Sequence, residues 1–204
     1  MTRTRIRYVS LAAALCLGGC VTVFPKHVAA ALYRFGPPPA GAGLKMAQVE
    51  VTTRFPPGDA GDGILTMTGD RAAYIDGARW VAPAALLFET AARSTLVAAD
   101  AAPGDAAQPR LAIDVLRFET DYDHGRDAAP TVRVEAVFTL TDGLGHPRAS
   151  RRSLSQRQAR ENGVGAIVAA YDLAVTDALQ DMNLMVSQTA SLPASGPEKG
   201  ATSR

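Results

Sequence analysis

Histidines are the side chains that would most readily support acid–base chemistry in this sequence. The chain contains three of them: His27, His124 and His146. None lies in a Gly-x-Ser-x-Gly, His-Glu-x-x-His or Cys-x-x-Cys pattern, so no nucleophile, zinc-ligand or redox motif accompanies them. An active site would have to be assembled from isolated residues, such as His124, Asp121 and Arg126, in a deep pocket whose carboxylates have perturbed pKa values. We therefore expect no enzymatic activity and no cofactor.

The segment DYDHGRD, residues 121–127, carries three carboxylates and invites comparison with a calcium-binding loop. An EF-hand loop that began at Asp121 would need glycine at its sixth position and glutamate at its twelfth. This chain has Arg126 and Val132 at those positions. We therefore expect a solvated loop between two strands and no metal site.

A second charged segment, PRASRRSLSQRQAR over residues 147–160, contains no acidic residue. Its five arginines are Arg148, Arg151, Arg152, Arg157 and Arg160. We expect a strand that leaves a turn at 142–147. Because the arginines occupy both parities of this strand, we expect an exposed edge without an alternating buried face. The charge either keeps the edge soluble and unpaired, or forms a surface that meets anionic lipid headgroups or an acidic partner.

The segment LAAALCLGGC, residues 11–20, places Cys20 directly after two glycines. Three arginines precede an apolar run from Tyr8 to Leu17, which is shorter than the roughly 20 residues that a spanning helix needs. This layout is typical of a secretory signal peptide. The quartet LGGC also resembles the lipobox of bacterial lipoproteins, in which a peptidase cuts before the cysteine and the thiol carries diacylglycerol. An ordinary signal peptide that contains cysteine, or an N-terminal core helix, is the alternative.

Cleavage before Cys20 would change the composition of the chain. It would leave 185 residues, and Lys plus Arg would fall from 21 to 18 against 20 acidic residues, a net charge of −2. This near-neutral balance argues against a nucleic-acid partner. Cys16 would leave with the signal peptide and Cys20 would carry lipid, so no disulfide could form within the mature chain.

The chain divides into four parts by composition. We expect a signal peptide, a lipidated cysteine followed by a Pro/Gly-rich tether with a first strand over 28–35, one folded domain, and a polar disordered tail. These parts cover residues 1–19, 20–43, 44–186 and 187–204.

Two elements of the domain are well marked. Residues 131–140 alternate apolar and polar side chains, which predicts a half-buried strand. Residues 163–186 place apolar side chains at helical spacing, which predicts an amphipathic helix with Asn162 as its N-cap. Weaker patterns predict a strand over 109–118, two short strands within 64–76, and a helix over 81–99. We predict an α+β fold: a single domain with a largely antiparallel sheet and two helices packed on one face.

An ordered set of packing residues supports a family resemblance. ALYRFGPP, followed by ILTMTGDRAAYIDGARWVAPAALLFETAARSTL, resembles the ABC-type transport auxiliary lipoprotein family. The matching residues are Tyr33, Phe35, Tyr74, Trp80 and Pro83. From its place between turn and helix, we expect Trp80 to pack the 64–76 hairpin onto the helix at 81–99.

The resemblance implies a non-enzymatic, lipid-anchored periplasmic component of an MCE-type (mammalian-cell-entry domain) ABC system that moves lipids across the envelope. Its implied partners are the membrane, through the lipid on Cys20, and an MCE-domain protein, a permease and an ATPase; a homo-oligomer is left open. The resemblance and Val21 after the cysteine favour the periplasmic face of the outer membrane. The alternative is a structural or assembly lipoprotein with no transporter partner.

Overall fold

The computed structural model describes residues 29–34, 49–96, 108–125 and 127–190. Cys20, Phe35, Arg126, the signal peptide, most of the tether and residues 191–204 lie outside the described residues. The predictions made for those parts therefore rest on the sequence.

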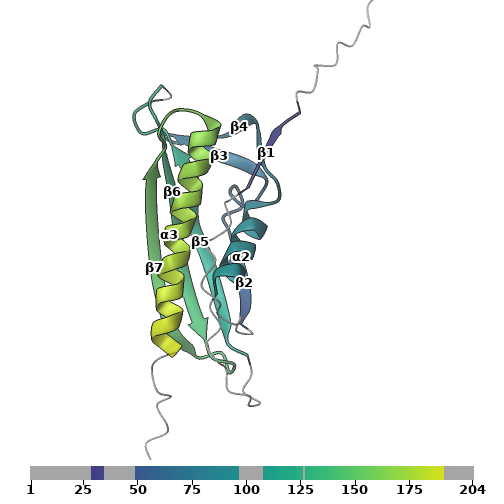
Figure 1. Ribbon diagram of the computed structural model, residues 1–204, viewed down its shortest axis with the longest axis vertical. Helices are drawn as coiled ribbons and strands as arrows, with labels where there is room; N and C mark the ends of the chain where they lie inside the picture. The colour runs from purple at the N-terminus through teal and green to yellow at the C-terminus, as the bar shows by residue number, and fades with distance from the viewer. Residues whose placement is uncertain (1–28, 35–48, 97–107, 126, 191–204) are drawn as a thin grey trace, which may run out of the picture.

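The described chain folds into seven strands and two helices in the order strands, helix, strands, helix (Figure 1). The strands are β1 (Ala31–Tyr33), β2 (Glu50–Arg54), β3 (Gly63–Thr68), β4 (Arg71–Trp80), β5 (Arg110–Asp121), β6 (Thr131–Thr141) and β7 (Pro147–Gln158). The helices are α2 (Ala84–Thr95) and α3 (Val164–Ala190).

All strands belong to one mixed sheet in the order β1-β4-β3-β5-β6-β7, and β2 also pairs with β5. The β3–β4, β5–β6 and β6–β7 pairs are antiparallel and contain most of the sheet's length. β2 pairs in parallel with the first half of β5, and β3 in parallel with its end at Thr120 and Asp121. β7 is an edge strand, as the sequence predicts.

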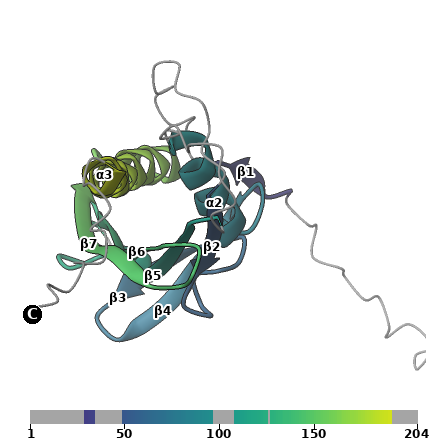
Figure 2. The same ribbon diagram turned by 90° about the horizontal axis from the view of Figure 1, so that it is seen from below.

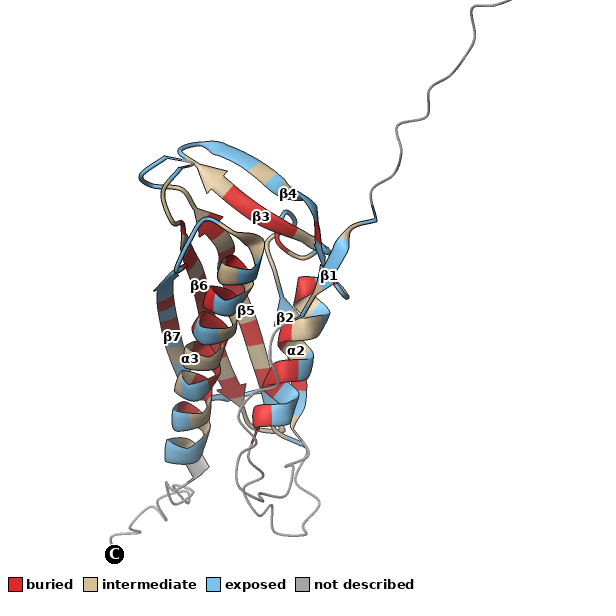
Figure 3. Cartoon of the chain, turned by 45° about the horizontal axis from the view of Figure 1, so that its top comes forward, coloured by how far each residue is buried: buried red, intermediate tan, exposed pale blue. Residues whose placement is uncertain are grey.

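Both helices cover the same face of the curved sheet (Figure 2). On that face β6 places alternate apolar side chains, and α3 turns its buried side toward them (Figure 3). The buried residues of β6 are Val132, Val134, Glu135, Ala136, Phe138 and Leu140, of which only Glu135 lies on the opposite face. The predicted α+β fold, with two helices on one face of a mostly antiparallel sheet, is confirmed.

An aromatic cluster joins the sheet to α3 in the centre of the core. Phe118 of β5 lies 4.7 Å from Tyr171 of α3 between ring centroids, and Phe55 and Phe88 pack edge-on around Phe118. The Tyr171 hydroxyl accepts a hydrogen bond from Thr120 at 3.2 Å, which satisfies its polar atom within the apolar core.

The structure differs from the predicted elements at several positions. β2 was not expected, because its five residues include one buried apolar side chain, Val51, and give little alternation. β4 is ten residues long and runs to Trp80, well past the predicted end of the hairpin. α3 begins at Val164, so Gly163 directly precedes it, and α3 continues to Ala190, into the segment predicted as a tail. The Oδ1 atom of Asn162, the predicted N-cap, accepts a hydrogen bond from the Tyr122 hydroxyl.

Neither α2 nor α3 combines the length and the apolar character that a membrane-spanning helix requires.

Candidate functional site

Two of the five arginines predicted as an interaction surface bind α3 instead of facing solvent freely. The guanidinium of Arg151 lies 2.8 Å from Asp181, and that of Arg157 lies 2.6 Å from Asp177. The two aspartates are four residues apart, so they lie on one face of the helix, above β7. These ion pairs connect the edge strand to the longest helix.

Two buried serines complete this contact. Ser153 is 2% exposed and donates to Asp181, and Ser155 is 6% exposed and donates to Asp177, both at 2.7 Å. In register with β6, Ser153 faces the core side of the sheet. β7 therefore has an alternating buried face, which corrects the expectation from the arginine spacing. The expectation failed because this buried face is polar and is satisfied by carboxylates of α3.

The other three arginines point elsewhere. Arg152 lies on the outer face of the sheet and pairs with Glu135, which is 6% exposed and also lies 3.7 Å from Arg117. Arg148 and Arg160 are exposed and make no ion pair within the part of the chain that the structure describes. Of the predicted arginine surface, these two side chains are the ones left for a partner.

A cleft of about 450 Å³ lies on the outer face near the end of β5, and its lining includes Asp59, Glu119 and Asp121, three carboxylates whose pKa values are raised. Burial, with repulsion from Glu119, raises the pKa of Asp59 to about 6, although the backbone N–H of Phe118 favours its charged form. Burial, with repulsion from Asp121, also raises the pKa of Glu119. Arg133 lies 2.6 Å from both Asp121 and Asp123 and neutralises part of this charge.

The cleft does not assemble the active site considered from the sequence. His124 is exposed and is absent from the cleft lining, and Arg126 lies outside the described residues. Asp121 and Asp123 of the 121–127 loop are paired with Arg133, and Asp127 is exposed. Among the described residues no group of three or more histidine, cysteine or acidic side chains is arranged to hold a metal ion.

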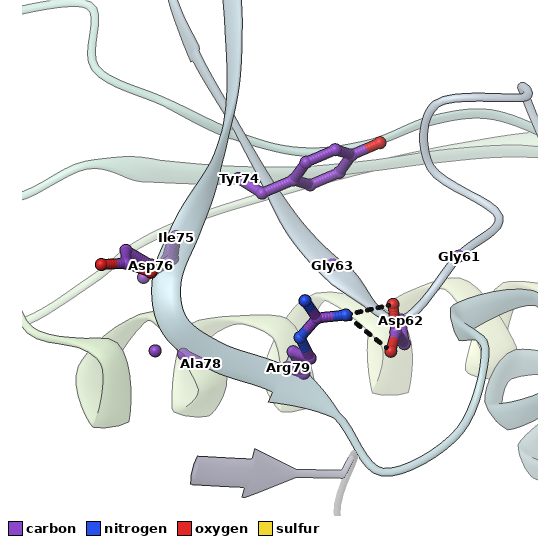
Figure 4. A pocket seen from close by; sticks show the side chains of 9 residues that line it. Gly61, Asp62, Gly63, Tyr74, Ile75, Asp76, Ala78 and Arg79 are labelled. Carbon is purple, nitrogen blue, oxygen red and sulfur yellow. Dashed lines mark hydrogen bonds and ion pairs between the residues drawn. The ribbon is translucent and has the colours of Figure 1, made fainter. Parts of the chain in front are cut away.

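A second hollow, of about 420 Å³, lies where β4 bends away from β3 (Figure 4). Gly77 adopts φ +67° at this bend, a conformation that favours glycine. The Tyr74 ring lies over Gly63, and a Cβ on that glycine would lie 2.5 Å from the ring. Arg79 donates two hydrogen bonds to the Asp62 carboxylate, at 3.2 and 3.3 Å. Only glycine at position 63 leaves room for the Tyr74 ring to lie so close to the backbone.

Tyr33 and Trp80, two residues of the family resemblance, lie beside this bend. Tyr33 is half-buried and is in register with Trp80, which is 2% exposed. The Trp80 ring contacts Tyr171 at 5.2 Å and Phe118 at 6.2 Å between centroids, so these contacts link β4 to α3 and β5. The expected packing of Trp80 against the following helix region at 81–99 stays a prediction; Ala84 and Phe88 of α2 belong to the same buried core as Trp80.

The remaining residues of the resemblance have separate positions. Pro83 occupies the N-cap of α2, and its carbonyl accepts the N–H groups of Leu86 and Leu87. Tyr74 is 57% exposed, and its hydroxyl donates to the Gly58 carbonyl at 2.8 Å. Phe35 lies outside the described residues.

The acidic partners that define the β7 contact are not predicted from the sequence. Asp177 and Asp181 lie within the predicted helix, and their spacing places them on one face beside the apolar stripe. The alternation Arg-x-Ser-x-Ser-x-Arg in the facing strand is the complementary signal. No sequence pattern indicates the role of Asp59, because it lies in an irregular loop and contacts β5 only in the folded chain.

Comparison with known proteins identifies the class. The sequence pattern of the family described as "ABC-type transport auxiliary lipoprotein component" matches residues 62–183, from the start of β3 through most of α3. Because this match covers more than half of the chain, the chain belongs to that family. Its class is thus an auxiliary lipoprotein of an ABC-type transport system, a membrane-anchored protein of the cell envelope.

Two solved structures share the fold. A crystal structure of a Xanthomonas campestris protein of family DUF330 has a TM-score of 0.59 and 24% identity, with 78% of this chain and 96% of that chain covered. A crystal structure of an uncharacterised protein also has a TM-score of 0.59, with 16% identity and coverage of 77% and 98%. A comparison with curated proteins found no match.

Proposed function

We propose that this chain is a non-enzymatic, lipid-anchored periplasmic accessory component of an MCE-type ABC system that moves lipids across the bacterial envelope. Family membership carries the proposal, because the matched segment 62–183 covers most of the folded domain, from β3 to most of α3. The lipobox-like LGGC quartet is an independent sequence feature outside that segment, and it supplies the anchor at Cys20.

The geometry of the domain agrees with a docking or assembly role. Of its two clefts, one is lined by carboxylates that are partly neutralised by Arg117 and Arg133, and the other by glycines and the Arg79–Asp62 pair. Neither brings a nucleophile and a base together. Within the described residues, both helices lie on the inner face of the sheet and its outer face carries no helix (Figure 2), which would leave that face for a protein neighbour.

The proposed location is the periplasmic face of the outer membrane, with the acyl chains of Cys20 as the membrane attachment. Two or more acyl chains anchor a protein stably, because each buried CH₂ contributes about 0.8 kcal/mol. The proposed protein partners are the MCE-domain protein, permease and ATPase of the same system. Within this assembly the chain would hold the transporter against the membrane that exchanges lipid with it.

A genetic comparison separates this function from that of a structural lipoprotein without a transporter. We expect a deletion of this gene, a deletion of the system's permease and the double deletion to cause the same sensitivity to detergent, because one pathway is lost in each. A structural lipoprotein would instead give an additive defect in the double deletion. Absence of ATPase, permease and MCE-domain genes beside this gene would likewise favour the structural alternative.

A further inference from the structure

Exposed apolar side chains gather where the described chain begins. Leu32 on β1 is 63% exposed, Tyr74 on β4 is 57% exposed, and Val81 directly after β4 is 53% exposed. Single exposed apolar residues are common on soluble proteins, so their exposure alone indicates nothing. Their arrangement on the sheet is what distinguishes these three.

Strand register places these side chains in one row. Leu32 is the partner of Arg79 across the β1–β4 pair, and Arg79 is the partner of Gly63 across the β4–β3 pair. Residues in register present their side chains on the same face, and two strand spacings span about 10 Å. The Tyr74 ring lies over Gly63, on the side where that residue's Cβ would be.

Val81 extends the row toward α2. Its backbone N–H donates to the Tyr33 carbonyl at 2.6 Å, so it lies directly beside β1. It also follows Arg79 by two residues, which continues the parity of the outer face. Trp80, between them, is buried on the opposite face.

Polar groups lie within and beside the row. Arg79, in register between Leu32 and Gly63, pairs with Asp62 at 3.2 Å, and Arg34 is exposed at the end of β1. Asp76 is also exposed beside the hollow under Tyr74. Apolar side chains, a tyrosine and both signs of charge form the mixture that suits the interface between lipid headgroups and acyl chains, where tyrosine is enriched.

The chain between Cys20 and this row is short, which limits how far the row can lie from the proposed lipid anchor. From Cys20 to Ala29, the first described residue, the chain can span at most about 30 Å when fully extended. β1 follows directly at Ala31. α3 ends at the bottom of Figure 1, far from β1, and its 27 residues alone extend about 40 Å. Of the exposed large apolar residues in the described part of the chain, Leu32 of β1 is nearest to Cys20 in sequence.

We propose that Leu32, Tyr74 and Val81 form a membrane-contact surface that rests on the lipid bilayer holding the Cys20 anchor. This inference rests on the proposed lipidation of Cys20. The acyl chains would hold the protein on the bilayer, whereas this surface would fix its orientation, with β1 toward the lipid and the α3 C-terminus away from it. The occupant is the lipid surface itself.

Site-specific fluorescence quenching in vesicles tests the orientation. The full chain is expressed, processed and purified in its lipidated form, then reconstituted into phosphatidylethanolamine and phosphatidylglycerol vesicles. With Cys16 removed and Cys20 acylated, Leu32→Cys would introduce the only free thiol, which is labelled with bimane. The matched control is Leu144→Cys, at the β6–β7 turn, where the leucine is 81% exposed. Val81→Cys is a second probe of the row should Leu32→Cys fold poorly.

The expected result is several-fold stronger quenching by nitroxide-labelled lipid at positions 32 and 81 than at position 144, with the reverse order for aqueous iodide. Equal iodide access at all three positions, in protein that floats with the vesicles, overturns the membrane-contact surface and leaves the anchor intact. Protein that does not float with the vesicles shows instead that the lipid on Cys20 does not anchor the chain, and both proposals fail.

Discussion

At the residue scale, Asp59 shows how one polar side chain can hold an irregular loop. It is 7% exposed, and its Oδ2 accepts the Phe118 N–H of β5 at 3.2 Å. The same loop supplies the Gly61 carbonyl that accepts the Ala84 N–H at the start of α2. The carboxylate thus connects the loop between β2 and β3 to the centre of the sheet.

The raised pKa of Asp59 gives this contact a pH dependence. Its pKa rises from 3.8 to about 6 because burial disfavours the charge, so folding favours the protonated form. That contribution to stability is full below the unfolded pKa and is lost as the pH rises through about 6. Glu119 and Asp121 have raised pKa values and act in the same direction.

The variant Asp59→Asn isolates this effect, because the amide oxygen can still accept the Phe118 N–H. We expect the difference in Tm, variant minus wild type, to increase from about pH 4 to about pH 7 as the wild-type carboxyl ionises. Thermal unfolding across this range checks it. A difference that stays constant with pH would mean that Asp59 does not titrate within the folded protein in this range.

Trp80 is the residue whose loss should cost most in the core. It is 2% exposed and contacts Phe118 and Tyr171. We expect Trp80→Ala to lower the free energy of unfolding by about 3–5 kcal/mol. Leu154→Ala, on the outer face where the leucine is 57% exposed, is the control and should change stability little. An unchanged melt together with lost partner binding would instead assign Trp80 to recognition.

At the element scale, the contact between β7 and α3 depends on paired polar groups. Asp181 accepts hydrogen bonds from Arg151 and from the buried Ser153. We expect Asp181→Ala to destabilise the protein by about 1–3 kcal/mol, because the serine hydroxyl loses its partner. Urea unfolding measures the effect, with Arg148→Gln as the exposed control within about 0.5 kcal/mol of wild type. Equal stability of both variants would show that the α3 carboxylates do not support the strand.

The contact between β7 and α3 limits which arginines can be replaced in a test of partner binding. Replacing Arg151 or Arg157 would disturb α3, so an effect on binding would be ambiguous. We propose that the exposed Arg148 and Arg160 contribute to docking an acidic partner surface. Replacing both with Gln should leave the melt unchanged and weaken partner capture, with the largest loss at low salt, where charge interactions are least screened. Capture that is unchanged at every salt concentration would leave β7 only as a charged, protected edge.

The elements that sequence predicts well are the long periodic ones. β6 and α3 repeat their apolar residues over ten or more positions, so both are evident without tertiary information. β2 is defined by its pairing with β5, a contact between distant parts of the chain that five residues cannot encode locally. The inner face of β7 was missed for a related reason, since its burial depends on carboxylates supplied by α3.

At the scale of the whole molecule, one folded domain follows a proposed membrane anchor. The domain belongs to the ABC-type transport auxiliary lipoprotein family over residues 62–183. The proposed anchor at Cys20 lies outside the described residues and rests on the signal-peptide layout and the LGGC quartet. The arginines of β7 and the apolar row beside β1 lie on opposite edge strands of the sheet, so partner and bilayer could be bound together.

The most direct test is quantitative mass spectrometry of the complexes captured with this chain from cross-linked cell envelopes. The chain carries a C-terminal tag, and wild type is compared with Cys20→Ser. We predict that wild type is recovered from the outer-membrane fraction together with the MCE-domain protein, permease and ATPase of one ABC system. The Cys20→Ser variant should leave the membrane fraction and lose most of these partners. Recovery of wild type as a soluble protein, or from the membrane without any component of an ABC system, would contradict the account.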